Sequence, residues 1–275
     1  MMLKFSANLS TLFQDRPLAE RIAAARAAGF GAVEMWFPYD VPPDQLRATL
    51  HEHGLPMIGI NSAPGNVGAG DWGLAADPRR RGAFVDSLHE AFEYARMIGC
   101  PNVHVMAGIV DSSISHAAAW DTYEANIDEA CRIAAHHALT VMIEPLNAVD
   151  RPAYLLTRQR QAIALIEKLK RPNLKIMLDL FHVQRGEGNL IERMLASLPH
   201  AAHVQIADVP GRHEPGTGEI NFRKVFDTLQ AAGWNGWVGA EYFPLGGTEA
   251  GLGWMGSAAD GTWHGQQIAA HRTAL

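Results

Sequence analysis

The 275-residue sequence predicts a single-domain α/β protein with a closed (β/α)₈ barrel, the TIM-barrel fold. Eight short apolar stretches alternate with helical segments, and each helix can return the chain so that successive strands pair in parallel. The length is also normal for eight such units. The alternative is a doubly wound open sheet, but no Gly-x-Gly-x-x-Gly motif follows the first strand.

Each predicted strand is a short run rich in apolar residues. The first four are Leu3–Ser10, Ala32–Phe37, Pro56–Ser62 and Asn102–Ile109. The last four are the start of Thr140–Asn147, where Pro145 ends the run, then Leu174–Leu180, Ala202–Ala207 and Trp237–Tyr242. Apolar runs of this kind are buried on both faces of a parallel sheet.

The predicted helices have apolar residues at helical spacing and recognisable ends. They are Pro17–Ala28, Pro43–His53, a long helix from Pro78 to about Ile98, Trp120–Ala138, about Arg158–Lys170, Leu190–Leu198 and Phe222–Ala232. Prolines fit the first turns, Asp77 and Thr157 are predicted N-caps, and glycines follow several C-termini. A Gly-rich stretch at residues 63–73 is too irregular for either element.

The barrel domain is predicted to span residues 1–255, closed by a short helix at Thr248–Met255. Residues 256–275 show only a weak hydrophobic pattern and are predicted to form a loose tail. No linker or charge block indicates a second domain.

Composition excludes several function classes. A formal charge of −6 and a pI near 6.1 argue against a general nucleic-acid or membrane surface. The N-terminus lacks the pattern of a signal peptide, and no apolar run approaches the length of a membrane span. Cys100 and Cys131 have no metal-motif spacing and cannot form a disulfide framework. We therefore expect a cytoplasmic protein; the sequence leaves open whether it forms a homo-oligomer.

Oxygen-bearing side chains stand near the ends of the last four strands. Glu144 follows Val141–Ile143, Asp179 follows Ile176–Leu178, and Gln205 and Glu241 lie near the ends of the last two strands. The strands of such a barrel converge on the active site at their carboxyl ends. Three carboxylates and one amide oxygen form a hard ligand set, which predicts a divalent metal, Mg²⁺ or Mn²⁺. Each residue taken alone fits a buried hydrogen bond or salt bridge equally well.

A divalent cation beside two glutamates favours one kind of chemistry. The cation polarises a carbonyl, one glutamate removes a proton from the neighbouring carbon, and the second glutamate returns it through an enediolate.

Further residues after the strands are candidates for substrate binding. His182 and Arg212 are suited to a substrate oxygen and a substrate carboxylate, respectively. Glu219 is a candidate to orient Arg212 or the metal ligands, and His104 and Asn147 are weaker pocket candidates.

The assembled stretches resemble the hydroxypyruvate isomerase and 2-oxo-tetronate isomerase family of the xylose-isomerase-like barrel superfamily. They include FSANLSTLF, GFGAVEMWFPYD, IEPLN, LDLFHVQ, HVQIADVPGRHEPGTGEINF and GAEYFPLGGTEAGLGWM. The resemblance implies that Glu144, Asp179, Gln205 and Glu241 bind the metal and that Glu144 and Glu241 also transfer protons. It places His182 and Arg212 at substrate contacts. Gln205, where many sugar epimerases carry histidine, favours the hydroxypyruvate branch.

The sequence thus predicts an aldose–ketose-type isomerase acting on a small hydroxy-keto acid, with hydroxypyruvate and tartronate semialdehyde as the favoured pair. Three alternatives remain: an isomerase or 3-epimerase of a longer substrate, a metal-dependent endonuclease that acts at abasic sites, and a non-catalytic binding barrel. The acidic charge and the short histidine set argue against the endonuclease.

Overall fold

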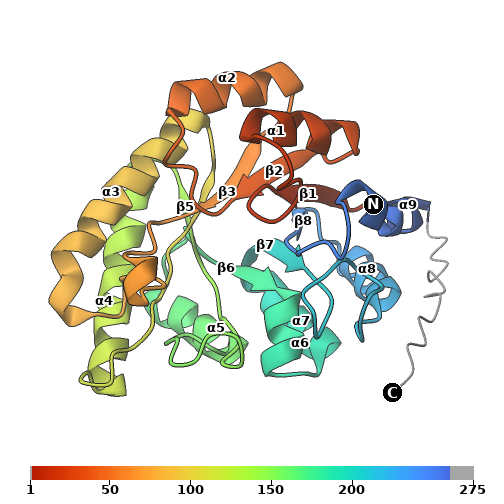
Figure 1. The fold of residues 1–275 in the computed structure, drawn as a ribbon. Helices are drawn as coiled ribbons and strands as arrows, with labels where there is room; N and C mark the ends of the chain where they lie inside the picture. The colour runs from red at the N-terminus through yellow and green to blue at the C-terminus, as the bar shows by residue number, and fades with distance from the viewer. Residues whose placement is uncertain (1, 261–275) are drawn as a thin grey trace.

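The computed structural model describes residues 2–260 of the protein. Strands and helices alternate along this part of the chain (Figure 1). The strands are β1 Lys4–Asn8, β2 Ala32–Met35, β3 Met57–Asn61, β4 Asn102–His104, β5 Thr140–Ile143, β6 Leu174–Asp179, β7 Ala201–Ile206 and β8 Trp237–Ala240. The helices are α1 Leu18–Ala27, α2 Pro43–His53, α3 Arg81–Ile98, α4 His116–Ala135, α5 Gln159–Leu169, α6 Leu180–Gly186, α7 Leu190–Ser197, α8 Phe222–Ala231 and α9 Gly253–Asp260.

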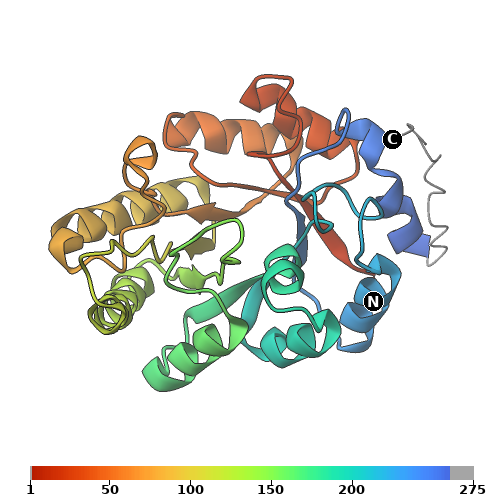
Figure 2. The same ribbon diagram turned by 60° about the horizontal axis from the view of Figure 1, so that its bottom comes forward.

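The strands form a closed barrel in the order of the sequence, which confirms the predicted fold. All neighbours are parallel, and β8 pairs with β1 through Lys4–Trp237 and the residues that follow. Figure 2 shows the helices as an outer ring around the strands. Among the described residues, no helix combines the length and apolar character needed to span a membrane.

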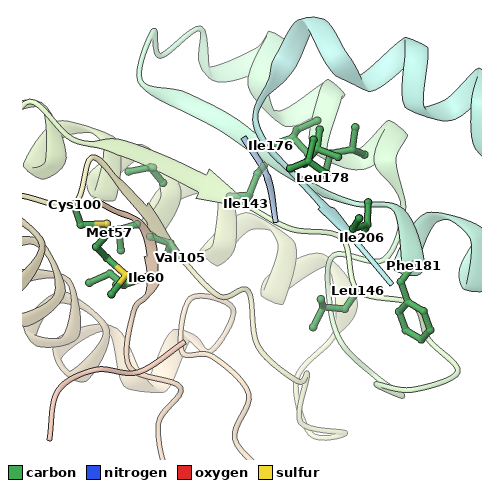
Figure 3. Close-up of a cluster of buried hydrophobic side chains, with 14 of the residues drawn as sticks. Met57, Ile60, Cys100, Val105, Ile143, Leu146, Ile176, Leu178, Phe181 and Ile206 are labelled. Atoms are coloured by element: carbon green, nitrogen blue, oxygen red, sulfur yellow. The ribbon is translucent and has the colours of Figure 1, made fainter. Parts of the chain in front are cut away.

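Aliphatic side chains fill the interface between strands and helices. Ile143, Ile176, Leu178 and Ile206, from three neighbouring strands, gather in one buried cluster (Figure 3). β5, β6 and β7 are therefore held side by side by packing as well as by backbone hydrogen bonds. The carboxyl ends of these strands carry three of the four predicted metal ligands, Glu144, Asp179 and Gln205.

Two helix starts differ from the prediction. α4 begins at His116, four residues before the expected Trp120, because the Ser115 hydroxyl accepts a hydrogen bond from the Ala118 backbone N–H. At the start of α5, Thr157 is not the capping residue. Instead Gln161 Oε1 accepts hydrogen bonds from the backbone N–H groups of residues 157 and 158, at 3.1 and 3.0 Å. Asp77 does cap the turn before α3, as predicted.

The segment after β8 also differs from the prediction. The predicted closing helix is split into a 3₁₀ turn at Glu249–Gly251 and helix α9. α9 runs to Asp260, beyond the predicted end of the closing helix at Met255, and residues 261–275 of the predicted tail lie outside the described residues. Trp254 of α9 packs edge-on against Phe5 of β1 at 5.1 Å between ring centroids, which attaches α9 to the barrel wall.

The Gly-rich stretch is ordered by two local interactions. Gly73 forms an isolated antiparallel bridge with Ala107, just beyond β4. Asp71 accepts a hydrogen bond from the Asn66 backbone N–H at 2.6 Å and pairs with Arg80 at 2.6 Å. These contacts bring Trp72 to the carboxyl-end side of the barrel.

Gly73 should be indispensable to this arrangement. It has φ +116°, and an added Cβ would lie 2.6 Å from the Met106 carbonyl oxygen. Gly70 has φ +95° but no atom within 4 Å of such a Cβ, so it isolates the effect of backbone strain. We expect Gly70→Ala to cost about 1 kcal/mol of unfolding free energy. Gly73→Ala should cost about 2 kcal/mol more, because it adds a steric clash.

Urea denaturation monitored by tryptophan fluorescence would measure both costs. Equal losses in the two variants would contradict the close packing of Gly73 on Met106.

Candidate active site at the carboxyl end of the barrel

The structure brings all four predicted metal ligands to one end of the barrel. Asp179 is the last residue of β6, Gln205 lies in β7, and Glu144 and Glu241 directly follow β5 and β8. All four side chains are buried. Gln205 Nε2 donates a hydrogen bond to Glu241 Oε2 at 2.6 Å. The parallel strands of the barrel therefore bring together four residues that are far apart in the sequence.

Arg212 connects two of these carboxylates. Its Nη2 donates to Glu241 Oε1 at 2.6 Å and to Asp179 Oδ2 at 3.3 Å, and the guanidinium lies 5.1 Å from the centre of the Phe181 ring. The sequence predicted that Arg212 binds a substrate carboxylate. The structure places it against the proposed metal ligands, where it neutralises part of their charge.

Asp208 holds the loop that carries Arg212. One carboxylate oxygen accepts backbone hydrogen bonds from Val209 and Ile220, and the other accepts them from Gly216 and Gly218, all at 2.8–3.0 Å. The Arg212 backbone has φ +57°, a conformation that is costly without surrounding support. The loop is thus folded around one buried carboxylate.

Burial and mutual repulsion raise the proton affinity of the cluster. The pKa of Glu144 is raised well above its usual range by burial and by the nearby Asp179 and Glu241. Burial also raises the pKa of Glu241 to about 8, although Arg212 acts in the opposite direction. The pKa of Asp179 is raised by burial, again against the effect of Arg212.

A polar layer beneath the site was not predicted from the sequence. Glu34 of β2 is buried, accepts a hydrogen bond from Gln205 Nε2 at 2.8 Å, and lies 2.5 Å from His203 Nε2. Asn8 of β1 donates to both Glu34 and Glu241, at 3.2 and 2.7 Å. Burial alone would raise the pKa of Glu34, but His203 and the amide donors hold it below the usual value. The signal was present: Glu34 is a carboxylate inside an apolar strand, whereas Glu144 directly follows one.

His182 lies in helix α6, directly after β6, rather than in a loop. Its Nδ1 accepts a hydrogen bond from the Asn147 backbone N–H at 3.2 Å. Burial, and then Arg212, lower the pKa of His182 well below its usual value, so the ring is neutral. Nε2 therefore carries the proton, and it lies 3.6 Å from Asp179 Oδ2 and 3.9 Å from Glu144 Oε1. His182 is arranged as a hydrogen-bond donor.

His104 and Glu219 differ in their relation to the site. His104, in β4, lies with Nδ1 3.6 Å from Glu144 Oε2 and 3.3 Å from Asn61 Oδ1, and burial lowers its pKa to about 3. Glu219 does not reach the cluster. It is exposed, and its carboxylate accepts a hydrogen bond from Gln184 at 3.1 Å. The structure therefore gives Glu219 no contact with Arg212.

A pocket of about 240 Å³ opens above the cluster. Glu144, Glu241, His182, Arg212 and His104 line it, and its remaining lining residues include Trp36, Asn61, Trp72, Asp150, Arg151 and Phe243. This volume is below the roughly 300–1,000 Å³ of pockets for drug-sized ligands. The pocket is therefore suited to a small polar substrate. Asp150 and Arg151 were not predicted as site residues, although they follow Asn147 closely in the sequence.

The residues present fit a divalent cation. Ligand atoms of Glu144 and Asp179 lie within 4.8 Å of one another and of a His182 ring nitrogen, and the three residues form a candidate metal-binding cluster. With the proton on Nε2, His182 is a hydrogen-bond donor beside the ion rather than a ligand. Glu144 Oε1 and Gln205 Oε1 are buried and have no hydrogen-bond partner in the described part of the chain. Three ionised carboxylates and one guanidinium would leave two negative charges, which a divalent cation matches.

Comparison with known proteins gives the family. A model of the xylose isomerase-like TIM barrel matches residues 22–258. The chain belongs to this family. Within the family it is 41% identical to 2-oxo-tetronate isomerase of Cupriavidus necator, over 92% of this chain and 98% of the relative. It is 39% identical to hydroxypyruvate isomerase of Escherichia coli, over the same shares of the two chains.

A solved structure agrees with this relationship. The crystal structure of AP endonuclease, family 2 from Brucella melitensis matches with a TM-score of 0.90 and 40% identity, over 94% of this chain and all of that one. The predicted family resemblance is confirmed. The chain is an isomerase-like enzyme of the aldose–ketose type, similar to the two named relatives.

The raised carboxyl pKa values predict how the stability of this family member depends on pH. The Glu241 pKa of about 8 exceeds the ordinary 4.5, so its stabilising effect is complete below pH 4.5 and is lost as pH rises through 8. His104 and His182 have lowered pKa values, so their stabilising effect is complete above pH 6.5 and is lost at lower pH. In chelator, the free energy of unfolding should therefore fall from pH 6.5 to 8.

Urea denaturation of the wild type and of Glu241→Gln across this range would measure the effect. The free energy of unfolding of the variant should fall less steeply with pH, because its amide does not titrate. An identical slope in both proteins would contradict the raised Glu241 pKa.

Proposed function

We propose that the chain is a metal-assisted isomerase that interconverts hydroxypyruvate and tartronate semialdehyde by proton transfer through an enediolate. One observation carries the proposal: Glu144 and Glu241 line the same small pocket, and burial raises the pKa of each, that of Glu241 to about 8. Coupled carboxyls of this kind can hold one proton between them, so that one acts as base and the other as acid. The similarity to hydroxypyruvate isomerase supports the substrate.

The residues of the chain supply the proton chemistry. One glutamate takes a proton from the hydroxymethyl carbon of hydroxypyruvate, and the other delivers a proton to the former carbonyl carbon. The hydroxyl proton passes to the former carbonyl oxygen, so that the hydroxymethyl oxygen becomes the aldehyde oxygen. His182, with its proton on Nε2, is oriented to donate a hydrogen bond to a substrate oxygen. The strand-end positions of Glu144 and Glu241 keep both carboxyls in fixed places during the transfer.

Glu144, Asp179, Gln205 and Glu241 would hold Mg²⁺ or Mn²⁺, the ions that prefer oxygen ligands. A bound ion would polarise the substrate carbonyl and stabilise the negative charge that develops on its oxygen. Arg212 Nη2 contacts one oxygen each of Asp179 and Glu241, two of the residues that would hold the ion.

The second candidate substrate is a four-carbon acid. The relative from Cupriavidus necator, at 41% identity, is named 2-oxo-tetronate isomerase. The proton transfer would be the same, because both acids carry a carbonyl beside a carbon with a hydroxyl group. The pocket of about 240 Å³ has room for either acid, so the substrate assay distinguishes them.

Abasic-site cleavage is not proposed, although the structurally similar Brucella melitensis protein carries an endonuclease name. The formal charge of −6 opposes binding to a phosphate backbone. Among the described pocket residues, His104 and His182 are the histidines, and both are neutral and hydrogen-bonded or close to carboxylates.

The proposal is tested by direct assay. Purified protein should convert hydroxypyruvate to tartronate semialdehyde in the presence of Mg²⁺ or Mn²⁺, and chelation should suppress the conversion. Proton magnetic resonance would follow substrate and product, and parallel reactions would contain the four-carbon acid and neutral ketoses. Absence of turnover of hydroxypyruvate with either metal would reject it as the substrate.

The two glutamates should be separately essential. We expect Glu144→Gln and Glu241→Gln each to lower kcat by about 10³-fold or more, because an amide can neither accept nor deliver the proton. Glu167→Gln, an exposed change on α5, serves as the control and should retain full activity. Circular dichroism would verify that all three variants fold. A near-normal rate in either pocket variant would remove that residue from the mechanism.

A further inference from the structure

Arg151 lies at the pocket in a fixed position. It follows Glu144 by seven residues, in a turn where its backbone N–H donates to the Asn147 carbonyl at 3.1 Å. Its side chain lines the pocket, and its guanidinium lies 4.0 Å from the centre of the Trp72 ring. Trp72 in turn packs edge-on against Phe37 at 6.5 Å. Stacking on an anchored indole limits the orientations that the guanidinium can take.

The Arg151 guanidinium makes no ion pair with any residue in the range 2–260. The neighbouring Asp150 is already engaged: one oxygen accepts a hydrogen bond from Asn147 Nδ2 at 3.0 Å, and the other lies 3.6 Å from Arg185 Nε. Arg151 therefore faces the pocket with its hydrogen-bond donors available.

With all three carboxylates ionised, the charge balance of the pocket leaves a substrate carboxylate without a partner, and such a group supplies one. Arg212 and a divalent cation together carry three positive charges, and Glu144, Asp179 and Glu241 carry three negative charges when ionised. The deep end of the site is then neutral as a whole. A substrate carboxylate entering this buried space brings an additional negative charge, which is costly to bury without a partner. Among the described residues that line the pocket, Arg151 is the cation that this balance does not include.

We propose that Arg151 binds the carboxylate of the substrate and thereby makes the enzyme selective for hydroxy-keto acids over neutral ketoses of the same length. The inference rests on the proposed function and names its specificity-determining residue. The planar guanidinium presents two parallel N–H groups, the geometry that a carboxylate matches. The reacting carbons of the acid would then lie towards Glu144 and Glu241, with the carboxylate towards Trp72.

Two measurements test the assignment. Steady-state kinetics with hydroxypyruvate compare the wild type with Arg151→Met, which keeps an apolar stem over Trp72, and with Arg151→Lys, which keeps the charge. Arg160→Met, an exposed change on α5, is the control. Equilibrium titration with glycerate, a three-carbon hydroxy acid that the reaction cannot isomerise, measures carboxylate binding without turnover.

We expect Arg151→Met to raise KM and the glycerate Kd about 10- to 100-fold, the loss of a charge-assisted hydrogen bond, with kcat changed by less than about threefold. Arg151→Lys should recover part of the affinity, and Arg160→Met should match the wild type. An unchanged KM and glycerate Kd in Arg151→Met would overturn the inference.

The two proposals fail in different ways. If the wild type binds glycerate through Arg151 but does not isomerise hydroxypyruvate, carboxylate recognition stands and the proposed reaction falls. If the wild type isomerises hydroxypyruvate and Arg151→Met loses kcat with unchanged KM, the reaction stands and Arg151 is not the carboxylate-binding residue.

Discussion

The structure depends on the burial of three carboxylates against one guanidinium at the carboxyl end of the barrel. Glu144, Asp179 and Glu241 are almost entirely removed from water, and Arg212 reaches two of them. Such a cluster is unfavourable unless each charge is compensated or neutralised by a proton. The carboxyl pKa values are raised because part of the negative charge remains uncompensated. The same uncompensated charge makes the site suited both to a cation and to proton transfer.

Much of the surrounding structure supports this cluster. The carboxylate of Asp208 folds the loop that positions Arg212, and Asn8 and Gln205 both donate to Glu241. Beneath them, the Glu34–His203 pair gives the barrel interior a second polar layer. These side chains come from four different strands and one loop, so the rigid barrel, rather than any local segment, determines the geometry of the site.

The pocket also has two chemically distinct ends. The deep end holds the carboxylates and the neutral His182, whereas the outer side is formed by aromatic residues such as Trp72 and by Arg151. A short acid can therefore be oriented by its own charge while its carbon atoms face the glutamates. Under the proposed function, this polarity would let one small pocket combine proton transfer with selection of the substrate.

The sequence by itself determined the fold and the strand-end residues, because strand alternation and the position of a carboxylate after an apolar run are local patterns. Glu144, Asp179, Gln205 and Glu241 were found as oxygen-bearing side chains near the ends of apolar runs. Only the tertiary structure decided which groups meet: Glu34 with His203, Arg212 with Asp179 and Glu241, and Arg151 with Trp72. It also separated Glu219 from Arg212 despite their closeness in sequence. These contacts depend on loop conformation and on the direction of each side chain. Both are set by burial, charge and backbone strain across the whole molecule, and neither produces a periodic pattern in the sequence.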